Sequence, residues 1–388
     1  MKVFFSFLVK TAICLLPLLL VCSCESKQPS VSVKDEIHLT LEPQRLPSIA
    51  KLSEIAVGVR LVPLQTDTSC FMGSTNMVYV GRKSMIISTV GDMSELFHFT
   101  PDGRFLNKIG KQGKGPGEYT EISSMTVMEA TSSVYLRGWS MRRILEYSVG
   151  GKLIREINAG IGSRGTMVLE PARIAFNSSK DYEVQIVDLK AGDTLKYIKT
   201  NPATASGLPR FSGSREMGFY YSALGRDTIW RIDPDSMRPL FVCNFGSGHF
   251  TTNDYFKSMH DPNGYPAGKL SIGGGIIYGS GYYGFSLLRQ NDQKEYTYAH
   301  VMIDEKTKNA WHLEQGPESD DILFCTSTDF RTVSASGEWV SVVGAEELLE
   351  ALPQIRENKN FKYPPELIGQ IEKMTIEDNP VLVFYSFR

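Results

Sequence analysis

The segment Ile109–Tyr119, which reads IGKQGKGPGEY, decides the fold prediction because it places four glycines and a proline between two runs of strand-forming residues. Glycine permits backbone angles that other residues avoid, and proline cannot donate a hydrogen bond to a β-ladder. Strand pairing must therefore stop in this segment. We predict a structural loop in which the tyrosine ring is buried and the carboxylate accepts backbone N–H groups; its residues are Gly113, Gly115, Pro116, Gly117, Glu118 and Tyr119.

A glycine-rich segment can also bind phosphate, but this one lacks the features of a phosphate loop. Such a loop opens a helix and carries a Lys-Ser/Thr pair, or it forms part of a Rossmann-type strand-turn-helix. The chain from Ile122 to Trp139 instead reads ISSMTVMEATSSVYLRGW. Because this run is rich in β-branched and aromatic residues and is broken by small polar ones, it predicts two further strands.

The sequence around the loop is a repeat. HFTPDGRFLNKI at residues 98–109 and EYSVGGKLIREI at residues 146–157 align with a shift of 48 residues, so that Gly103 falls on Gly151. Weaker copies of this strand, turn and strand pattern begin at Val184, Asp227 and Tyr296. A period of this length with several strands in each unit is typical of propeller blades and not of the shorter helical solenoids.

The repeat predicts an all-β protein, a six-bladed β-propeller with four-stranded antiparallel blades, with five or seven blades as alternatives. We place the blades at residues 75–109, 122–157, 166–199, 216–246, 270–313 and 322–343, the last with a return strand. Helical segments at 345–351 and 365–374 are expected to interrupt the last blade. The chain ends in NPVLVFYSF, and ring closure predicts that this strand shares a blade with the early strands at 37–41 and 59–64.

The N-terminus predicts a lipoprotein signal peptide. Lys2 and Lys10 flank an apolar run that ends at Ser23-Cys24, and a small residue directly before a cysteine is the cleavage pattern of lipoproteins. Cys22 is the rival acceptor, but it follows the larger Val21. We therefore predict a signal peptide at 1–23, lipidation of Cys24, a flexible tether at 24–36 and one propeller domain at 37–388. A transmembrane anchor is the alternative, although Lys10 shortens its apolar run.

Charge and cysteine content exclude several kinds of partner and cofactor. Without residues 1–23 the chain has 39 basic and 43 acidic residues, since the full sequence has 41 and 43 and the removed segment contains two lysines and no acid. We expect no nucleic-acid partner, because no basic patch is present. Cys70, Cys243 and Cys325 allow one disulfide at most, and the pair stays open. No zinc-type spacing occurs, so we predict neither metal nor cofactor.

The span from Ile109 to Lys152 resembles an NHL repeat, and the whole mature chain resembles the six-bladed β-propeller lipoproteins of Bacteroidetes, an NHL/TolB-like fold. The motifs that carry this likeness are VRLVPLQT, FTPDGRFLNKIGKQGKGPGEY, GRDTIWRID and EDNPVLVFYSF, in this order. Arg137-Gly138-Trp139 stands where NHL repeats have Asp-x-x-Asn, which weakens any transfer of NHL function. The resemblance implies a fold and no activity for particular residues.

Loops at the mouth of the propeller channel are where we expect ligand contacts. An aromatic residue beside two guanidinium groups, Trp139 with Arg142 and Arg143, is suited to a carboxylate or a sugar face. The alternative is that one of these arginines braces a neighbouring blade. His260 on the long 249–269 insert and Tyr282 in the run GYYGF are further binding candidates. The insert histidines lack regular ligand spacing, so a metal site is not favoured.

No catalytic residue is predicted, since no Gly-x-Ser-x-Gly elbow occurs. We favour a non-catalytic binding or scaffolding protein of the bacterial cell envelope, a monomer held by lipid to the outer membrane and facing the periplasm or the surface. Its ligand would be a protein, a peptide or a glycan. The alternative is a lyase or hydrolase acting on a glycan or peptide at the channel mouth. Three or more converging His, Asp or Glu side chains would favour the enzyme.

Overall fold

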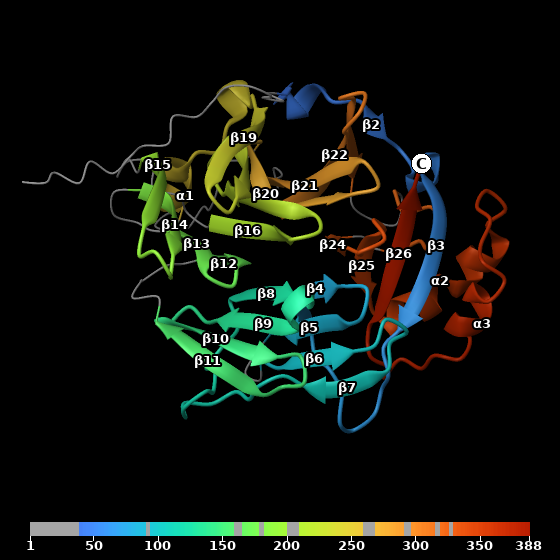
Figure 1. The fold of residues 1–388 in the computed structure, drawn as a ribbon. Coiled ribbons are helices and arrows are strands. Elements are labelled where there is room, and N and C mark those ends of the chain that lie inside the picture. Colours follow the sequence, from blue (N-terminus) through green and yellow to red (C-terminus); the bar gives the residue numbers. More distant parts are fainter. Residues whose placement is uncertain are drawn as a thin grey trace, which may run out of the picture.

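The structure, a computed structural model, places antiparallel sheets around a central axis (Figure 1). It describes residues 39–90, 94–158, 165–177, 182–199, 209–258, 268–290, 296–314, 319–325 and 329–388. The predicted signal peptide, Cys24 and the tether lie outside these residues, as does His260. Six sheets form the ring, each with four antiparallel strands at its centre, so the prediction of a six-bladed β-propeller is confirmed.

The first three blades are simple antiparallel meanders. The strands of each blade are named in order from the central axis outwards. Blade 1 contains β4 (Thr75–Val80), β5 (Met85–Thr89), β6 (Leu96–Phe99) and β7 (Phe105–Lys108). Blade 2 contains β8 (Ser124–Met128), β9 (Ser133–Arg137), β10 (Arg143–Ser148) and β11 (Leu153–Asn158). Blade 3 contains β12 (Thr166–Glu170), β13 (Arg173–Asn177), β14 (Tyr182–Asp188) and β15 (Thr194–Lys199).

Blades 4 and 5 each gain a fifth strand from the N-terminal segment. Blade 4 contains β16 (Pro209–Ser214), β17 (Gly218–Ala223), β18 (Thr228–Asp233) and β19 (Ser236–Cys243), with β1 (Leu39–Leu41) parallel to β19. Blade 5 contains β20 (Leu270–Gly279), β21 (Tyr282–Gln290), β22 (Tyr296–Asp304) and β23 (Ala310–Glu314), with β2 (Ser48–Ile49) parallel to β23. The added strands pair with outer strand edges that would otherwise be open.

Blade 6 joins the two ends of the chain. It contains β24 (Phe330–Val333), β25 (Trp339–Val343), β26 (Val381–Phe387) and β3 (Ala56–Pro63). Strands β26 and β3 pair antiparallel and lie side by side in Figure 1, in red and blue. The predicted closure is therefore confirmed for the early strand at 59–64 and wrong for the one at 37–41, which covers the edge of blade 4 instead.

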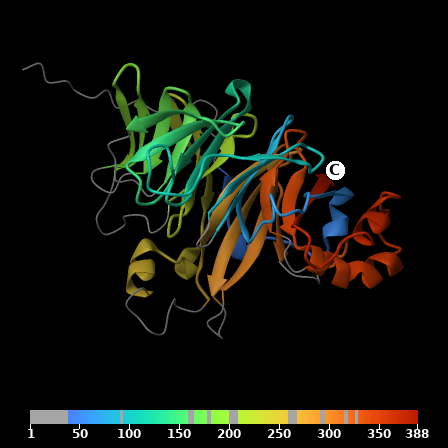
Figure 2. The same ribbon diagram turned by 90° about the horizontal axis from the view of Figure 1, so that it is seen from below.

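Three α-helices of the described segments lie outside the blades. Helices α2 (Ala345–Glu357) and α3 (Leu367–Ile371) interrupt blade 6 between β25 and β26, as predicted, and Figure 2 shows them at the outer side of that blade. Helix α1 (Thr252–Ser258) lies in the long insert. Short 3₁₀ helices occupy Pro43–Arg45, Leu52–Glu54, Glu129–Thr131 and Gly246–Gly248. None of the helices among the described residues has the length and apolar character needed to cross a membrane.

The 48-residue repeat corresponds to equivalent turns in blades 1 and 2. Gly103 and Gly151 both have φ near +90°, and each donates its N–H to the carbonyl three residues earlier. A Cβ on Gly151 would lie 2.7 Å from the carbonyl oxygen of Lys108, on the outer strand of the preceding blade. Gly103 is packed in the same way against Pro63 of blade 6. The repeated glycine thus allows each turn to contact the neighbouring blade.

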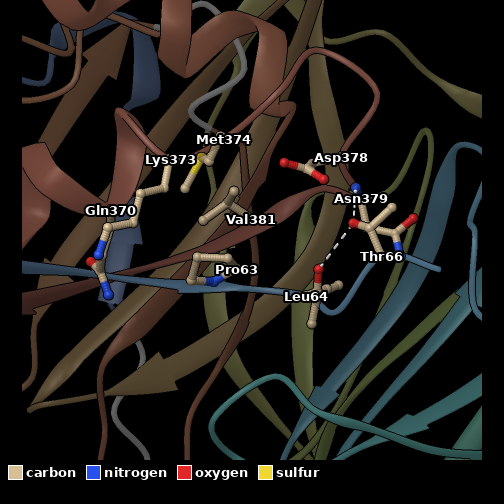
Figure 3. A pocket seen from close by; sticks show the side chains of 9 residues that line it. All are labelled: Pro63, Leu64, Thr66, Gln370, Lys373, Met374, Asp378, Asn379 and Val381. Carbon is tan, nitrogen blue, oxygen red and sulfur yellow. Dashed lines mark hydrogen bonds between the residues drawn. The ribbon is translucent and has the colours of Figure 1, made fainter.

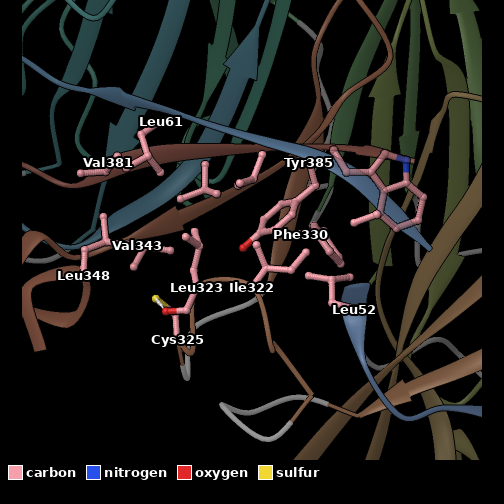
Figure 4. Packing of buried hydrophobic residues seen from close by; sticks show 14 of the residues in the cluster. Leu52, Leu61, Ile322, Leu323, Cys325, Phe330, Val343, Leu348, Val381 and Tyr385 are labelled. Atoms are coloured by element: carbon pink, nitrogen blue, oxygen red, sulfur yellow. Dashed lines mark hydrogen bonds between the residues drawn. The ribbon is translucent and has the colours of Figure 1, made fainter. Parts of the chain in front are cut away.

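The core of the described residues divides into six clusters, one at each interface between adjacent blades. The cluster between blades 5 and 6 extends under α2 and α3 and contains Trp339 and Tyr385 at 0% exposure (Figure 4). Cys70, Cys243 and Cys325 are buried in these clusters, and none forms a disulfide. The buried apolar contacts thus lie between neighbouring blades. The ring is therefore stable only when blade 6, which joins the two ends of the chain, packs against both of its neighbours.

Ring closure is reinforced by a clamp at Asn379, which is 2% exposed. Its side-chain nitrogen donates to the carbonyls of Gln65 and Cys70 at 2.6 and 2.8 Å, and its side-chain oxygen accepts the Met72 N–H at 2.8 Å. The same residue borders a shallow pocket of about 290 Å³ beside α3, shown in Figure 3. Because both ends of the Asn379 amide are hydrogen-bonded to backbone groups, we assign this side chain a role in ring closure and not in ligand binding.

We expect Asn379→Ala to lower the free energy of unfolding by about 2–3 kcal/mol, because it removes the side-chain partners of the Cys70 carbonyl and the Met72 N–H and one of two partners of the Gln65 carbonyl. Denaturant titration of the full chain measures this change. Asn253→Ala, at an exposed position of α1, is the matched control and should change stability by less than about 0.5 kcal/mol. Equal effects of the two substitutions would contradict the clamp.

Candidate functional site

A cavity of about 630 Å³ lies at the centre of the ring. Every innermost strand contributes to its wall, so the cavity is the central channel of the propeller. The lining residues come from β4 (Asn76 to Tyr79), β8 (Met125 to Val127), β12 (Met167), β16 with its following turn (Arg210 to Ser214, Met217), β20 (Gly273 to Ile277), β21 (Ser286) and the start of β24 (Asp329 to Thr332). This size is in the range of small-molecule sites.

Three of the innermost strands carry bulges at the channel. Asn76 and Met77 of β4 lie opposite one residue of β5, and Arg331 is the extra residue of β24. In β20 the three residues Gly273 to Gly275 lie opposite Ser286 alone. Bulges redirect side chains and interrupt regular ladders, and they are enriched next to functional sites. The channel wall is therefore irregular on three of its six sides.

Only three charged side chains line the cavity among the described residues: Arg210, Asp329 and Arg331. The Nε of Arg331 lies 3.0 Å from the Asp329 carboxylate, and the Arg331 side chain is 43% exposed. Arg210 is exposed, and no hydrogen-bond or ion-pair partner is found for it in the described part of the chain. The lining charges sum to +1, because one of the two guanidinium groups is balanced by the carboxylate.

A buried histidine lies behind this wall, between a serine and an aspartate that line the channel. The Ser286 hydroxyl is 3.2 Å from Nδ1 of His300, and Nε2 of His300 is 3.9 Å from Asp329. His300 itself is buried, with its ring 5.4 Å from that of Phe330. Serine and aspartate both line the channel, so the histidine connects two channel residues from inside the blade 5–blade 6 interface.

The opposite half of the channel is mainly apolar. Met77, Met125 and Met167 come from the innermost strands of blades 1, 2 and 3. Burial raises the pKa of the Tyr79 hydroxyl, and the nearby carboxylates of Glu216 and Glu129 raise it further, so this phenol stays protonated. Methionine side chains are flexible and polarizable and adapt to ligands of different shape.

Comparison with models of protein families shows to which family this propeller belongs. The family described as Domain of unknown function (DUF4934) matches residues 36–386. The chain belongs to the DUF4934 family. Comparison with curated proteins gave no match for this DUF4934 chain.

A solved structure from Bacteroides fragilis is similar in fold to this DUF4934 protein. An exported protein from Bacteroides fragilis is 16% identical with a TM-score of 0.65, covering 88% of this chain and 98% of that one. A DUF4221 family member from Bacteroides vulgatus is 11% identical with a TM-score of 0.49, covering 85% of this chain and 98% of that one. The resemblance to six-bladed propellers of Bacteroidetes is thus confirmed for fold and family.

The binding residues predicted from sequence do not come together in the DUF4934 structure. Trp139 and Arg142 lie in the loop between β9 and β10, and Arg143 begins β10, at the end of the channel where the innermost strands begin. Tyr282 begins β21 at the opposite end, and its hydroxyl donates to the Arg388 carbonyl at 2.9 Å. Trp139 is 53% exposed, and none of the four lines the cavity among the described residues. Their binding role stays a prediction.

Arg143 forms an ion pair with Glu156 of its own blade, with 3.2 Å between Nη1 and the carboxylate. Arg137 of the same blade does brace a neighbouring blade: it is buried and donates to the Thr166 hydroxyl of blade 3 at 2.6 Å. Arg137 stands in the motif Arg-Gly-Trp that departs from the NHL pattern. The sequence pattern suggests Arg142 or Arg143 for this contact and does not select Arg137.

His249 is the described histidine of the insert. Its ring stacks on Phe245 with a centroid distance of 5.1 Å, and burial lowers its pKa, which favours the neutral form. Its Nε2 is buried and has no hydrogen-bond partner among the described residues. The described residues contain no group of three or more His, Cys, Asp or Glu side chains arranged to hold a metal ion.

The glycine-rich loop connects β7 to β8 and packs on blade 2. Tyr119 is 1% exposed, and the Glu118 carboxylate accepts the Gly115 N–H at 2.8 Å, which holds the Glu118 pKa below its usual value. Gly117 has φ +71°, donates its N–H to Glu156 at 2.9 Å and accepts the Tyr147 hydroxyl. These contacts are those expected of a structural loop.

We expect Gly117→Val to destabilise the protein by about 1–3 kcal/mol, because valine is strained at positive φ. Its Cβ would also lie 2.7 Å from a methyl carbon of Leu153. The melting temperature of the full chain measures the effect. Lys114→Ala at an exposed position of the same loop should cost less than about 0.5 kcal/mol. If Lys114→Ala abolished ligand capture while Gly117→Val melted like wild type, the structural assignment would be wrong.

Proposed function

We propose that this protein is a lipid-anchored, non-catalytic binding protein of the bacterial cell envelope that takes its ligand into the central channel. The observation that carries the proposal is the cavity of about 630 Å³, whose wall combines guanidinium groups with methionine and aromatic side chains. The wall of this cavity is more polar than that of the usual small-molecule site, so a ligand with polar or charged groups fits it best. A segment of a peptide, a protein or a glycan is the ligand class that we favour.

A screen of peptides and glycans against the purified full-length protein in detergent tests this proposal. A ligand of the folded form raises the melting temperature by mass action. Met125→Trp should abolish that shift, because the larger side chain fills the cavity from blade 2. Met374→Trp, outside the channel beside α3, is the control. A ligand that stabilises wild type and Met125→Trp equally would place binding outside the channel and contradict the proposal.

The anchor is part of the proposal and rests on Ser23-Cys24 after the apolar N-terminal run. We expect Cys24→Ala to abolish metabolic labelling by a fatty-acid analogue and to move the protein from the membrane fraction to the soluble fraction. Cys22→Ala is the matched control and should stay labelled. If Cys24→Ala remained labelled and membrane-bound, the anchor would lie elsewhere. Protease accessibility on intact cells distinguishes the surface from the periplasm.

A second candidate, a hydrolase, is favoured by the Ser286–His300–Asp329 arrangement. In that case the Ser286 hydroxyl would attack an acyl carbon while His300 accepts its proton. The separation of 3.9 Å between His300 and Asp329 is longer than a hydrogen bond, so binding without chemistry remains our choice. A fluorophosphonate probe decides between them: labelling that disappears in Ser286→Ala favours the hydrolase, and no labelling of the folded wild type favours binding.

A further inference from the structure

The two guanidinium groups of the channel stand on either side of blade 5. Arg210 lies on β16 of blade 4 and Arg331 on β24 of blade 6, and both line the same cavity. Asp329 contacts Nε of Arg331, and the structure records no partner for the two terminal nitrogens of Arg331 among the described residues. Donors of this kind form paired hydrogen bonds with carboxylate oxygens. The channel therefore contains uncommitted donors suited to an anion.

The glycine bulge of β20 provides room between these arginines. A Cβ at Gly273 would lie 2.9 Å from Leu288, and one at Gly275 would lie 2.8 Å from Ser212. Without side chains, the bulge can pack closely against β21 and β16, and its three glycines add no side-chain bulk to the channel wall at blade 5. The close packing is fixed by hydrogen bonds, since Ser212 accepts the Ile276 N–H at 2.8 Å and Ser222 donates to the Gly274 carbonyl at 3.1 Å.

The charge and polarity of the wall limit the kind of anion. Arg210, Arg331 and Asp329 sum to +1, which matches a monoanion better than a phosphate dianion. The methionines of blades 1 to 3 face the channel from the other half of the ring, where an apolar group would be desolvated. A cavity of about 630 Å³ holds a small molecule or the end of a chain, and not a folded domain.

We propose that the channel binds an organic monocarboxylate, with its carboxylate on Arg210 and Arg331 and its apolar part on Met77, Met125 and Met167. This inference rests on the proposed function and names its ligand chemistry. A free carboxylic acid and the C-terminus of a peptide present the same group, so the experiment has an arm for each. Arg104, which is 73% exposed on the turn between β6 and β7 and lies outside the cavity lining, provides a charge-matched control.

The test is titration calorimetry of the full-length protein in detergent with pairs of probes. Hexanoate and 3-phenylpropionate are compared with their neutral amides, and a Gly-Gly-Phe tripeptide with its amidated form. We expect at least one carboxylate to bind and its amide to bind at least about 10-fold more weakly, because a charge-assisted pair is lost. Arg210→Met should weaken carboxylate binding about 10- to 100-fold, whereas Arg104→Met should not change it.

The outcomes separate this inference from the function on which it rests. Equal affinity for a carboxylate and its amide, unchanged affinity in Arg210→Met, or no binding by any of the three carboxylates would overturn the monocarboxylate inference. In each case a ligand from the peptide and glycan screen that loses its effect in Met125→Trp would still support channel binding. Carboxylate binding that persists in Met125→Trp would overturn both.

Discussion

Removal of residues 381–388 is expected to abolish folding of the propeller. The deleted segment contains β26, which pairs with β25 on one side and with β3 on the other. Its side chains at 381–385 are buried, among them Phe384 and Tyr385. Without this strand β3 has no partner in blade 6, and two blade interfaces lose part of their cores. The net free energy of folding of a domain is only about 5–15 kcal/mol. We expect the combined loss of strand pairing and buried core side chains to exceed it.

Circular dichroism and limited proteolysis of the truncated chain measure this result. The control removes β1 (Leu39–Leu41), which pairs with β19 at the outer edge of blade 4 and buries one core side chain, Leu41, so that a folded ring of lower stability should remain. A chain without residues 381–388 that kept the wild-type strand content and unfolded in one cooperative transition would contradict closure by β26.

Trp339→Ala is expected to lower the free energy of unfolding by about 3–5 kcal/mol, the largest effect of any single substitution proposed for this chain. Trp339 is fully buried, and its ring lies 5.1 Å from Phe330 and 5.2 Å from Phe387 in edge-to-face contacts. Its indole N–H donates to the Gly279 carbonyl of blade 5 at 3.3 Å. The substitution thus opens a cavity and removes a hydrogen bond across the blade 5–blade 6 interface.

The exposed Trp139 supplies a control of the same residue type. Trp139→Ala should change stability by less than about 0.5 kcal/mol, since its side chain packs little against the protein. Chemical denaturation of both variants gives the comparison. Similar losses from the two substitutions would mean that the closure interface does not carry the stability assigned to it. The Trp139 variant also tests the loop for binding, through the ligand screen.

The propeller could be predicted because its signals are local. The repeated turn glycines Gly103 and Gly151 stand 48 residues apart, and both adopt the positive φ that only glycine reaches without strain. The loop ending in Glu118 and Tyr119 has the buried ring and the bound carboxylate that its sequence suggested. These local signals do not specify which blade the short strands β1 and β2 join. The open outer edge of a blade can pair with a short strand in several registers, so the strand sequence alone does not select one edge.

The channel could not be predicted from the same patterns, since its residues are far apart in sequence and were sought on loops. Arg210 and Arg331 lie on innermost strands, and sequence alone does not tell an arginine at a strand position facing the channel from one facing solvent. The triplet Gly273 to Gly275 was the available signal, because consecutive glycines inside a strand mark a bulge or a close approach. Its meaning depends on Ser212 and Ser286, which only the fold brings near.

Methyl NMR of the methionines tests most directly whether the channel is the ligand site. The chain has 14 methionines, of which Met77, Met125, Met167 and Met217 line the cavity. Met85 and Met302 are fully buried elsewhere and serve as internal references. When a ligand from the screens is added to methyl-labelled protein, we expect the resonances of the channel methionines to shift and those of the two references to stay in place. Saturating binding that leaves all four channel resonances unchanged would contradict the assignment of the channel as the ligand site.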